Sequence, residues 1–168
     1  ETDWKLYITN SNMISENIVG GRLKEFDSVL VMSHLKGHRM GGFGGALKQL
    51  SIGFASRAGK AWIHTAGVTN DYLKMWSSIA SQENFTAAMG DAATSIVNYF
   101  KNKGGKIVFI NVMANISTNC DCEKNAPEPK IKDICILAST DPVAIDRACV
   151  DMIKNINQNI SELINKSN

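Results

Sequence analysis

Residues Glu83–Met113, ENFTAAMGDAATSIVNYFKNKGGKIVFINVM, decide the fold class. From Glu83 to Lys103 the apolar side chains recur at helical spacing, and Gly104 and Gly105 end the run. Ile107–Met113 (IVFINVM) is then typical of a buried strand. The order helix, glycine, strand is the second half of a βαβ unit, which predicts an α/β domain.

The other predicted elements agree with that class. We expect strands at 28–32 (SVLVM) and 133–138 (DICILA), and helices at 47–54, closed by Gly53, at 70–81, and after Asp141-Pro142. Together these elements predict a single three-layer α/β domain over 1–168, with a mainly parallel sheet and helices on both faces. Residues 1–26 and 155–168 are expected to be peripheral. The first residues, ETDWKLYITN, are typical of the middle of a domain, which predicts a fragment lacking N-terminal strands.

Composition narrows the class of protein. The chain has a net charge of +2, 44% hydrophobic residues and a pI of about 8.4, and aromatic residues do not alternate with its basic ones, which argues against nucleic acid. Its apolar runs are too short to span a membrane. Four cysteines are too few to hold a small secreted fold together, so we expect a cytoplasmic protein.

The segment His34–His64 is the chemically distinctive part of the chain. It contains all three histidines, seven of the thirteen glycines and five Lys or Arg residues, and no Asp or Glu occurs between Asp27 and Asp71. A cationic, glycine-rich segment that follows a strand favours a small anionic ligand such as a phosphate, a carboxylate or an anionic cofactor.

Neither familiar phosphate-binding motif fits this segment. Gly42 and Gly44 begin a dinucleotide fingerprint, but Leu47 stands where the third glycine is needed. A P-loop fails as well, because Gly53 and the Gly59-Lys60 pair miss its spacing by one residue and Ala61 replaces the magnesium-binding hydroxyl. An anion would therefore be bound in another way.

Four blocks occur in order between about Asp27 and Asp151: VMSHLKGHRMGGFGGALKQ, GFASRAGKAWIH, NCDC and ILASTDPVAIDRACVDMI. They resemble a large family of uncharacterised iron–sulfur centre proteins, the domain of unknown function 362, in which many members carry a ferredoxin insertion after the SRAGK block. This chain has no C-x-x-C-x-x-C run and continues from Ala61 into a predicted helix. The resemblance therefore implies the subgroup without the insertion, with 27–151 as the family core and no ferredoxin-type cluster.

A fainter resemblance is to the nickel-pincer core of the lactate racemase family, carried by HRMGGFGGALKQLSIGFAS from His38 and by His64. In that family a histidine precedes the cofactor-bearing lysine by ten residues and a nickel-binding histidine follows it by sixteen, and His38, Lys48 and His64 keep both intervals. The resemblance implies that His38 is an acid–base residue, Lys48 the cofactor anchor and His64 a metal ligand. The family's second catalytic histidine has no counterpart before His34.

The residues support a similar site by their own chemistry. Neutral imidazoles bind metals and transfer protons near neutral pH, and glycines let a flat or phosphorylated ligand approach the backbone. A lysine that is surrounded by other cations and has no carboxylate nearby is disfavoured in its charged form. The neutral amine is then more readily available as a nucleophile. The predicted catalytic residues are His38 and Lys48, and the predicted cofactor-binding residues are Gly41, Gly42, Gly44, Gly45, Lys48, Ser56 and Lys60.

Each of these residues also has an ordinary structural interpretation. Lys48 could be a solvated residue at a helix start, and His38 and His64 could be hydrogen-bonded within the fold. His34, at the end of a strand, is expected to be structural.

Cys120 and Cys122 follow the IVFINVM strand and would point to the same side if extended. They are either metal ligands or redox residues together with His64, or a reduced thiol pair in a loop. Cys135 and Cys149 lie in apolar segments and are expected to behave as small buried hydrophobic residues.

Two functions from different classes follow. The first is an enzyme-type domain that binds a metal ion, an anionic cofactor or a metal–nucleotide and performs redox or proton-transfer chemistry on a small acid. The alternative is an electron-transfer or partner-binding adaptor, with a redox partner protein and without catalysis of its own. The sequence leaves both open.

Overall fold

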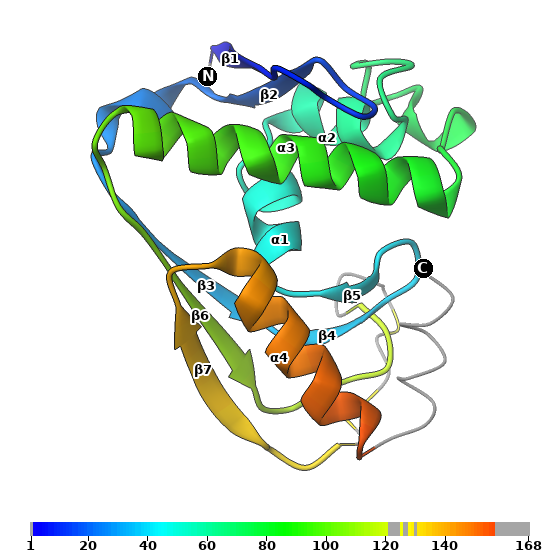
Figure 1. Cartoon of the computed structure of the whole chain (residues 1–168). Helices are drawn as coiled ribbons and strands as arrows, with labels where there is room; N and C mark the ends of the chain where they lie inside the picture. The colour runs from blue at the N-terminus through cyan, green and yellow to red at the C-terminus, as the bar shows by residue number, and fades with distance from the viewer. Residues whose placement is uncertain (1, 121–124, 126–127, 130, 157–168) are drawn as a thin grey trace. The chain divides into compact units, whose positions relative to one another are not determined.

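The computed structural model describes residues 2–120, 125, 128, 129 and 131–156. They form a mixed α/β structure, as the sequence predicts, that divides into two compact units (Figure 1). Unit 1 comprises Glu1–Val29 and Leu50–Ile107, and unit 2 comprises Leu30–Gln49 and Val108–Asn168.

Unit 1 is a β-hairpin packed against helices. Strands β1 (Asp3–Tyr7) and β2 (Glu16–Gly20) pair antiparallel, and Leu6, Ile18 and Val19 are buried. The apolar side of the long helix α3, with Phe85, Ala88, Ala92, Ile96 and Phe100, is fully buried. The helices of this unit are η1 (Gly21–Glu25), α2 (Arg57–His64), η3 (Met75–Ser77) and α3 (Gln82–Asn102).

Helix α3 confirms the helix expected from the 83–103 pattern. The Ser81 hydroxyl accepts a hydrogen bond from the Asn84 N–H and so caps its N-terminus. Gly104, with φ of 76°, follows its C-terminus in a left-handed conformation that favours glycine. The next residue, Gly105, lies so close to the Asp27 carbonyl that a side chain would collide with it.

The helix expected over 70–81 is wrong, because only the short 3₁₀ helix η3 forms there. Side chains in this segment and just before it bind nearby backbone groups, which are then not available to a helix. The Thr65 hydroxyl donates to the Thr69 carbonyl and accepts from its N–H, and an Asp71 oxygen accepts from the Leu73 N–H. Such local bonds compete with helix formation.

Unit 2 contains the central sheet. Its three strands lie in the order β3 (Val29–His34), β6 (Ile107–Met113) and β7 (Cys135–Ser139), and helix α4 (Pro142–Lys154) packs beside them (Figure 1). The strands expected at 28–32, 107–113 and 133–138 are thus confirmed. Asp141 caps α4 by accepting from the N–H groups of Val143 and Ala144, as the Asp-Pro pair predicts.

The expected mainly parallel sheet is not confirmed. Val29 donates to the Lys106 carbonyl and Leu35 to the Val112 carbonyl, so β3 and β6 run in the same direction. Strands β6 and β7 are antiparallel, as are the pairs β1–β2 and β4–β5. Apolar runs identify buried strands but carry no information on their direction, which depends on the connections between them. Helices on both faces of the sheet are likewise not confirmed among the described residues.

The glycine-rich segment forms a second small hairpin in unit 2, followed by a short helix. Its elements are β4 (Lys36–His38), β5 (Gly42–Gly44), α1 (Ala46–Lys48) and the π-helical turn η2 (Gln49–Gly53), which passes into unit 1. The short helix expected over 47–54 corresponds to α1 and η2. In the part of the chain that the structure describes, no helix is both long and apolar enough to cross a bilayer.

Candidate functional site

The β4–β5 hairpin places His38 opposite Gly42. Gly42 has a φ of 71°, so the return of the chain uses a conformation that favours glycine. In β4, Gly37 donates its N–H to the Ser117 carbonyl. A Cβ on Gly37 would collide with the Thr118 carbonyl. The glycines of this segment therefore serve close backbone packing within unit 2.

The ring of His38 is almost completely buried in the hairpin. Its Nδ1 accepts a hydrogen bond of 2.9 Å from the Gly41 N–H. Because a backbone N–H can only donate, Nδ1 holds a lone pair, and the proton of the neutral ring lies on Nε2. His34 is different, because its Nε2 lies 2.7 Å from the Ala114 carbonyl oxygen and joins the ends of two strand segments. That contact gives His34 the structural role expected of it.

The first turn of α1 is held by a carboxylate from α4. Asp146 accepts hydrogen bonds from the N–H groups of Ala46, at 2.7 Å, and Leu47, at 2.9 Å. Gly45, the N-cap, has no side chain to do this, and a Cβ at that position would collide with the Asp146 carboxylate. Negative charge at a helix N-terminus is favourable, so Asp146 both caps α1 and fixes its position.

Asp146 is 1% exposed and lies in a small polar network. The Asn111 side-chain amide donates to Asp146 Oδ1 at 2.7 Å and lies 3.4 Å from the Cys149 sulfur. Burial raises the pKa of Asp146, and the hydrogen bonds from Leu47, Asn111 and Ala46 act in the opposite direction. Burial also raises the pKa of the Cys149 thiol.

Lys48 is the last residue of α1, and its side chain extends over Gly44. A Cβ built on Gly44 would lie 3.3 Å from Lys48 Cδ, and Lys48 Nζ lies 4.0 Å from the Cys120 sulfur. Unit 2 thus brings together Lys48 and Cys120, which are 72 residues apart in sequence. Cys120 is disulfide-bonded, whereas Cys135 and Cys149 are free thiols. Cys122 lies outside the described residues.

The remaining predicted site residues lie on α2, in unit 1. The Ser56 hydroxyl caps this helix by accepting from the Gly59 N–H. His64 Nδ1 lies 2.7 Å from the Lys60 carbonyl, and its ring packs on Phe85 with the ring centres 4.9 Å apart. A carbonyl only accepts, so Nδ1 carries the proton and Nε2 the lone pair.

The structure therefore divides the predicted site between the two units. His38, the glycines from Gly41 to Gly45, Lys48 and Cys120 belong to unit 2, whereas Ser56, Lys60 and His64 belong to unit 1. Their convergence on one ligand stays a prediction. Among the residues that the structure describes, no group of three or more His, Cys, Asp or Glu side chains could hold a metal ion.

Comparison with known proteins identifies the family. Residues 1–151 match the family described as "Domain of unknown function (DUF362)". The chain belongs to this family. No curated protein and no solved structure matches this DUF362 chain. The family description assigns no cofactor, so the iron–sulfur and lactate racemase resemblances stay predictions.

Sequence reasoning missed Asp146, the residue that caps α1 in this DUF362 chain. A signal was present, because Asp146 falls on the apolar stripe of α4 between Ile145 and Cys149, where a carboxylate would be buried. A buried carboxylate must be hydrogen-bonded, so its position implied a partner elsewhere in the fold. The polar Asn111 within the apolar strand β6 was the matching signal.

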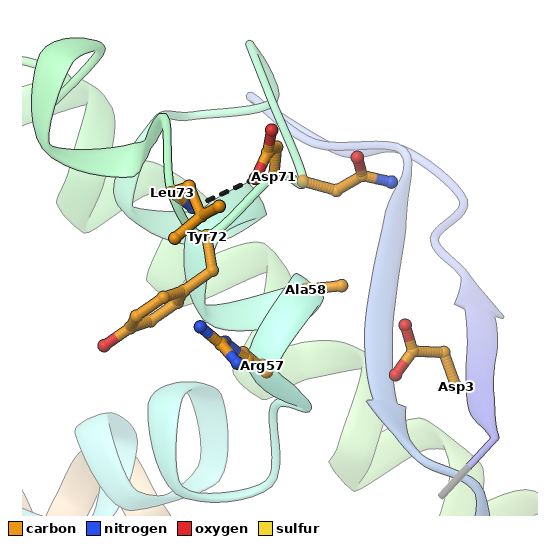
Figure 2. Close-up of a pocket in the computed structure, with 7 residues that line it drawn as sticks. Asp3, Arg57, Ala58, Asp71, Tyr72 and Leu73 are labelled. Carbon is orange, nitrogen blue, oxygen red and sulfur yellow. Dashed lines mark hydrogen bonds between the residues drawn. The ribbon is translucent and has the colours of Figure 1, made fainter.

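An open pocket of about 410 Å³ in unit 1 involves different residues from those expected (Figure 2). It is lined by Asp3, Arg57, Ala58, Asn70, Asp71, Tyr72 and Leu73. The Arg57 guanidinium lies over the Tyr72 ring, 4.7 Å from its centre. The Asp71 carboxylate accepts a hydrogen bond from the Leu73 N–H. The pocket combines both signs of charge with a shallow apolar wall, so it does not select one class of ligand.

Proposed function

We propose that this DUF362 chain is an enzyme-type domain whose β4–β5–α1 segment binds an anionic cofactor, a metal ion or a metal–nucleotide. The chemistry we infer is redox or proton transfer on a small acid. In this proposal His38 moves a proton, Lys48 anchors the ligand, and the backbone at Gly41, Gly42, Gly44 and Gly45 lines it. The proposal also places the domain in the cytoplasm, where the disulfide of Cys120 would be reduced.

The fixed position of Lys48 carries the proposal. Lys48 ends a helix of only three residues, which would be marginal alone, and Asp146 ties down the first two N–H groups of that helix. A lysine held in this way is preorganised for a ligand, which a solvated surface lysine is not. The buried His38 lies in the adjoining β4–β5 hairpin and supplies an imidazole, a side chain that can accept or donate a proton.

Charge supports an anion, although the backbone contributes less than the glycine content suggests. The N–H groups of Gly41, Ala46 and Leu47 already bind His38 or Asp146. The attraction would therefore come from side chains. Residues 30–49 contain Lys36, Arg39 and Lys48 and no Asp or Glu.

The proposed metal ligand His64 has a suitable orientation within unit 1. Metal-binding histidines usually donate their second ring N–H to a carboxylate or a carbonyl, as His64 Nδ1 does toward Lys60. Ser56, Lys60 and Cys122 stay sequence-based predictions for the same ligand. A thiolate ligand at Cys120 would require reduction of its disulfide.

The test measures the metal content and the intact mass of the native protein, purified without chelator and without a nickel affinity column. We expect stoichiometric metal by elemental analysis or a covalent mass increment by intact mass spectrometry. Lys48→Ala should lose it, and Lys101→Ala, which removes an exposed lysine of α3, should keep it. Equal content in the two variants would reject the role of Lys48.

The adaptor alternative gives a different result in the same experiment. A wild-type protein that carries neither metal nor an added mass, and that shows no stabilisation by inorganic phosphate, would favour an electron-transfer or partner-binding adaptor. In that case the relevant search is for a redox partner protein.

A further inference from the structure

The two faces of the central sheet in unit 2 are both apolar, but only one of them is covered. Side chains alternate along each strand, so Val31 of β3, and Phe109 and Met113 of β6, point to one side and are at most 2% exposed. Their neighbours Leu30 and Met32 point to the other side and are 56% and 60% exposed.

The covered face is closed by α4 (Figure 1). Cys149, Val150 and Ile153 of this 13-residue helix are buried in one cluster with Leu35 and Met113. The helix therefore buries the apolar side chains on this face of the sheet, as helices do in other α/β proteins.

The opposite side, which we call the outer face, has no comparable cover among the described residues. It consists of outward residues from three strands, of which Ile136 is 66% and Val108 is 39% exposed. The register pairs Ile110 with Ala138 and Val112 with Ile136, so the side chains form a continuous surface. The outer face comprises Leu30, Met32, Val108, Ile110, Val112, Ile136 and Ala138.

This surface is as large as the largest apolar patch of a typical monomeric protein. If a fully exposed large side chain presents roughly 150–200 Å², the four most exposed residues together present about 400 Å². The largest apolar patch of a typical monomer is about 300–600 Å² and commonly marks an interaction site. The outer face is in that range and contains no charged residue.

We propose that the outer face is the contact between two copies of this chain in a symmetric homodimer. A two-fold interface brings each surface against itself, so a charged face would repel its copy, whereas an uncharged apolar face is self-complementary. Two sheets packed face to face lie about 10 Å apart and interdigitate their side chains, as in a β-sandwich.

The area sets the expected strength of this dimer. Both copies together would bury about 800–1,000 Å², which is below the roughly 1,200 Å² of a stable interface and in the range of weak, transient ones. The dimer should therefore be weak and in rapid exchange, with a dissociation constant on the order of 1–100 μM. This proposal does not depend on the ligand proposed above.

Sedimentation equilibrium over a roughly 100-fold range of protein concentration tests the proposal. Wild-type protein should change from monomer to dimer across this range. Ile136→Lys places a like charge opposite its copy and should weaken dimerisation at least about tenfold. Val143→Lys is the matched control, because Val143 is 60% exposed but lies on α4, off the outer face, and it should dimerise as the wild type does.

Met32→Lys changes a different strand of the outer face and should weaken dimerisation in the same way. The test then does not depend on the correct folding of a single variant. A wild-type protein that is monomeric throughout would overturn the proposal. Dimerisation that Ile136→Lys and Met32→Lys leave unchanged, in variants with wild-type circular dichroism, would overturn it as well.

Discussion

Asp146 caps the helix that ends at Lys48, although the two residues come from separate chain segments of unit 2. The hydrogen bond from the Ala46 N–H to Asp146 spans 100 positions of sequence. The carboxylate replaces the side-chain cap that Gly45 cannot provide, and it fixes the only turn of α1. The position of Lys48 therefore depends on α4 being packed in place.

Asp146→Asn should lower the free energy of unfolding by about 1–3 kcal/mol. An amide offers one acceptor oxygen where the carboxylate offers two, so one of the three donors at this site loses its partner. Urea unfolding measures the change. Asp151→Asn, at an exposed position of the same helix, should change it by less than about 0.5 kcal/mol.

The stability that depends on Asp146 should vary with pH. Burial raises its pKa in the folded protein above the ordinary value of 3.8, so the unfolded chain loses this proton at lower pH than the folded one. The contribution is therefore largest below the ordinary pKa and declines as pH rises through the folded pKa. The stability advantage of wild type over Asp146→Asn should shrink as urea titrations move upward from about pH 4. An advantage that grows with pH would contradict this direction.

Gly45→Ala should destabilise the protein, because its Cβ would collide with the Asp146 carboxylate. A cost of about 1–3 kcal/mol is expected from this overpacking. Gly90→Ala is the contrasting change, since a Cβ there meets nothing within 4 Å and the residue lies within α3. Removing a helical glycine should raise the free energy of unfolding by about 0.5–1 kcal/mol. Thermal or urea unfolding of both variants tests the opposite signs.

Cys149 should resist alkylation in the folded protein. Its side chain has no exposed surface, and burial raises the pKa of the thiol, so little thiolate is available at pH 8. Peptide mass spectrometry after iodoacetamide treatment should find Cys149 unmodified, with a rate at least about tenfold below that in urea. Equal rates in the two conditions would show that this side of α4 opens readily.

Asp91→Asn should destabilise unit 1 by about 1–3 kcal/mol. The Asp91 carboxylate is 4% exposed and accepts hydrogen bonds from the N–H groups of Asn12, Met13 and Ile14. It thus attaches the turn of the β1–β2 hairpin to α3. Glu83→Gln, at an exposed position in the first turn of the same helix, should change the urea midpoint little.

Local patterns predicted several elements for identifiable reasons. The helical spacing of the 83–103 segment, the apolar run of β6 and the Asp141-Pro142 start of α4 each depend on residues close in sequence, and each is confirmed. The 70–81 helix failed for a local reason too, because the Thr65 and Asp71 side chains offered the backbone other partners.

The residues of the candidate site stay predictions, and the contacts that hold them in place were not predicted. The order of its residues pointed to His38 and Lys48, and the structure places both in one unit, with Lys48 near Cys120. The residues that hold this segment, Asp146 and Asn111, lie far along the chain, and single-sequence periodicity carries no information on contacts at such separations.

The amino-acid sequence by itself determined the strands β3, β6 and β7, the helices α3 and α4, and the family, because these follow from residues that are neighbours along the chain. Only the tertiary structure decided the direction of β7, the capping of α1 by Asp146, and which face of the sheet is covered by α4. These features depend on how distant segments share hydrogen bonds and apolar surface, and such sharing is settled when the whole chain packs.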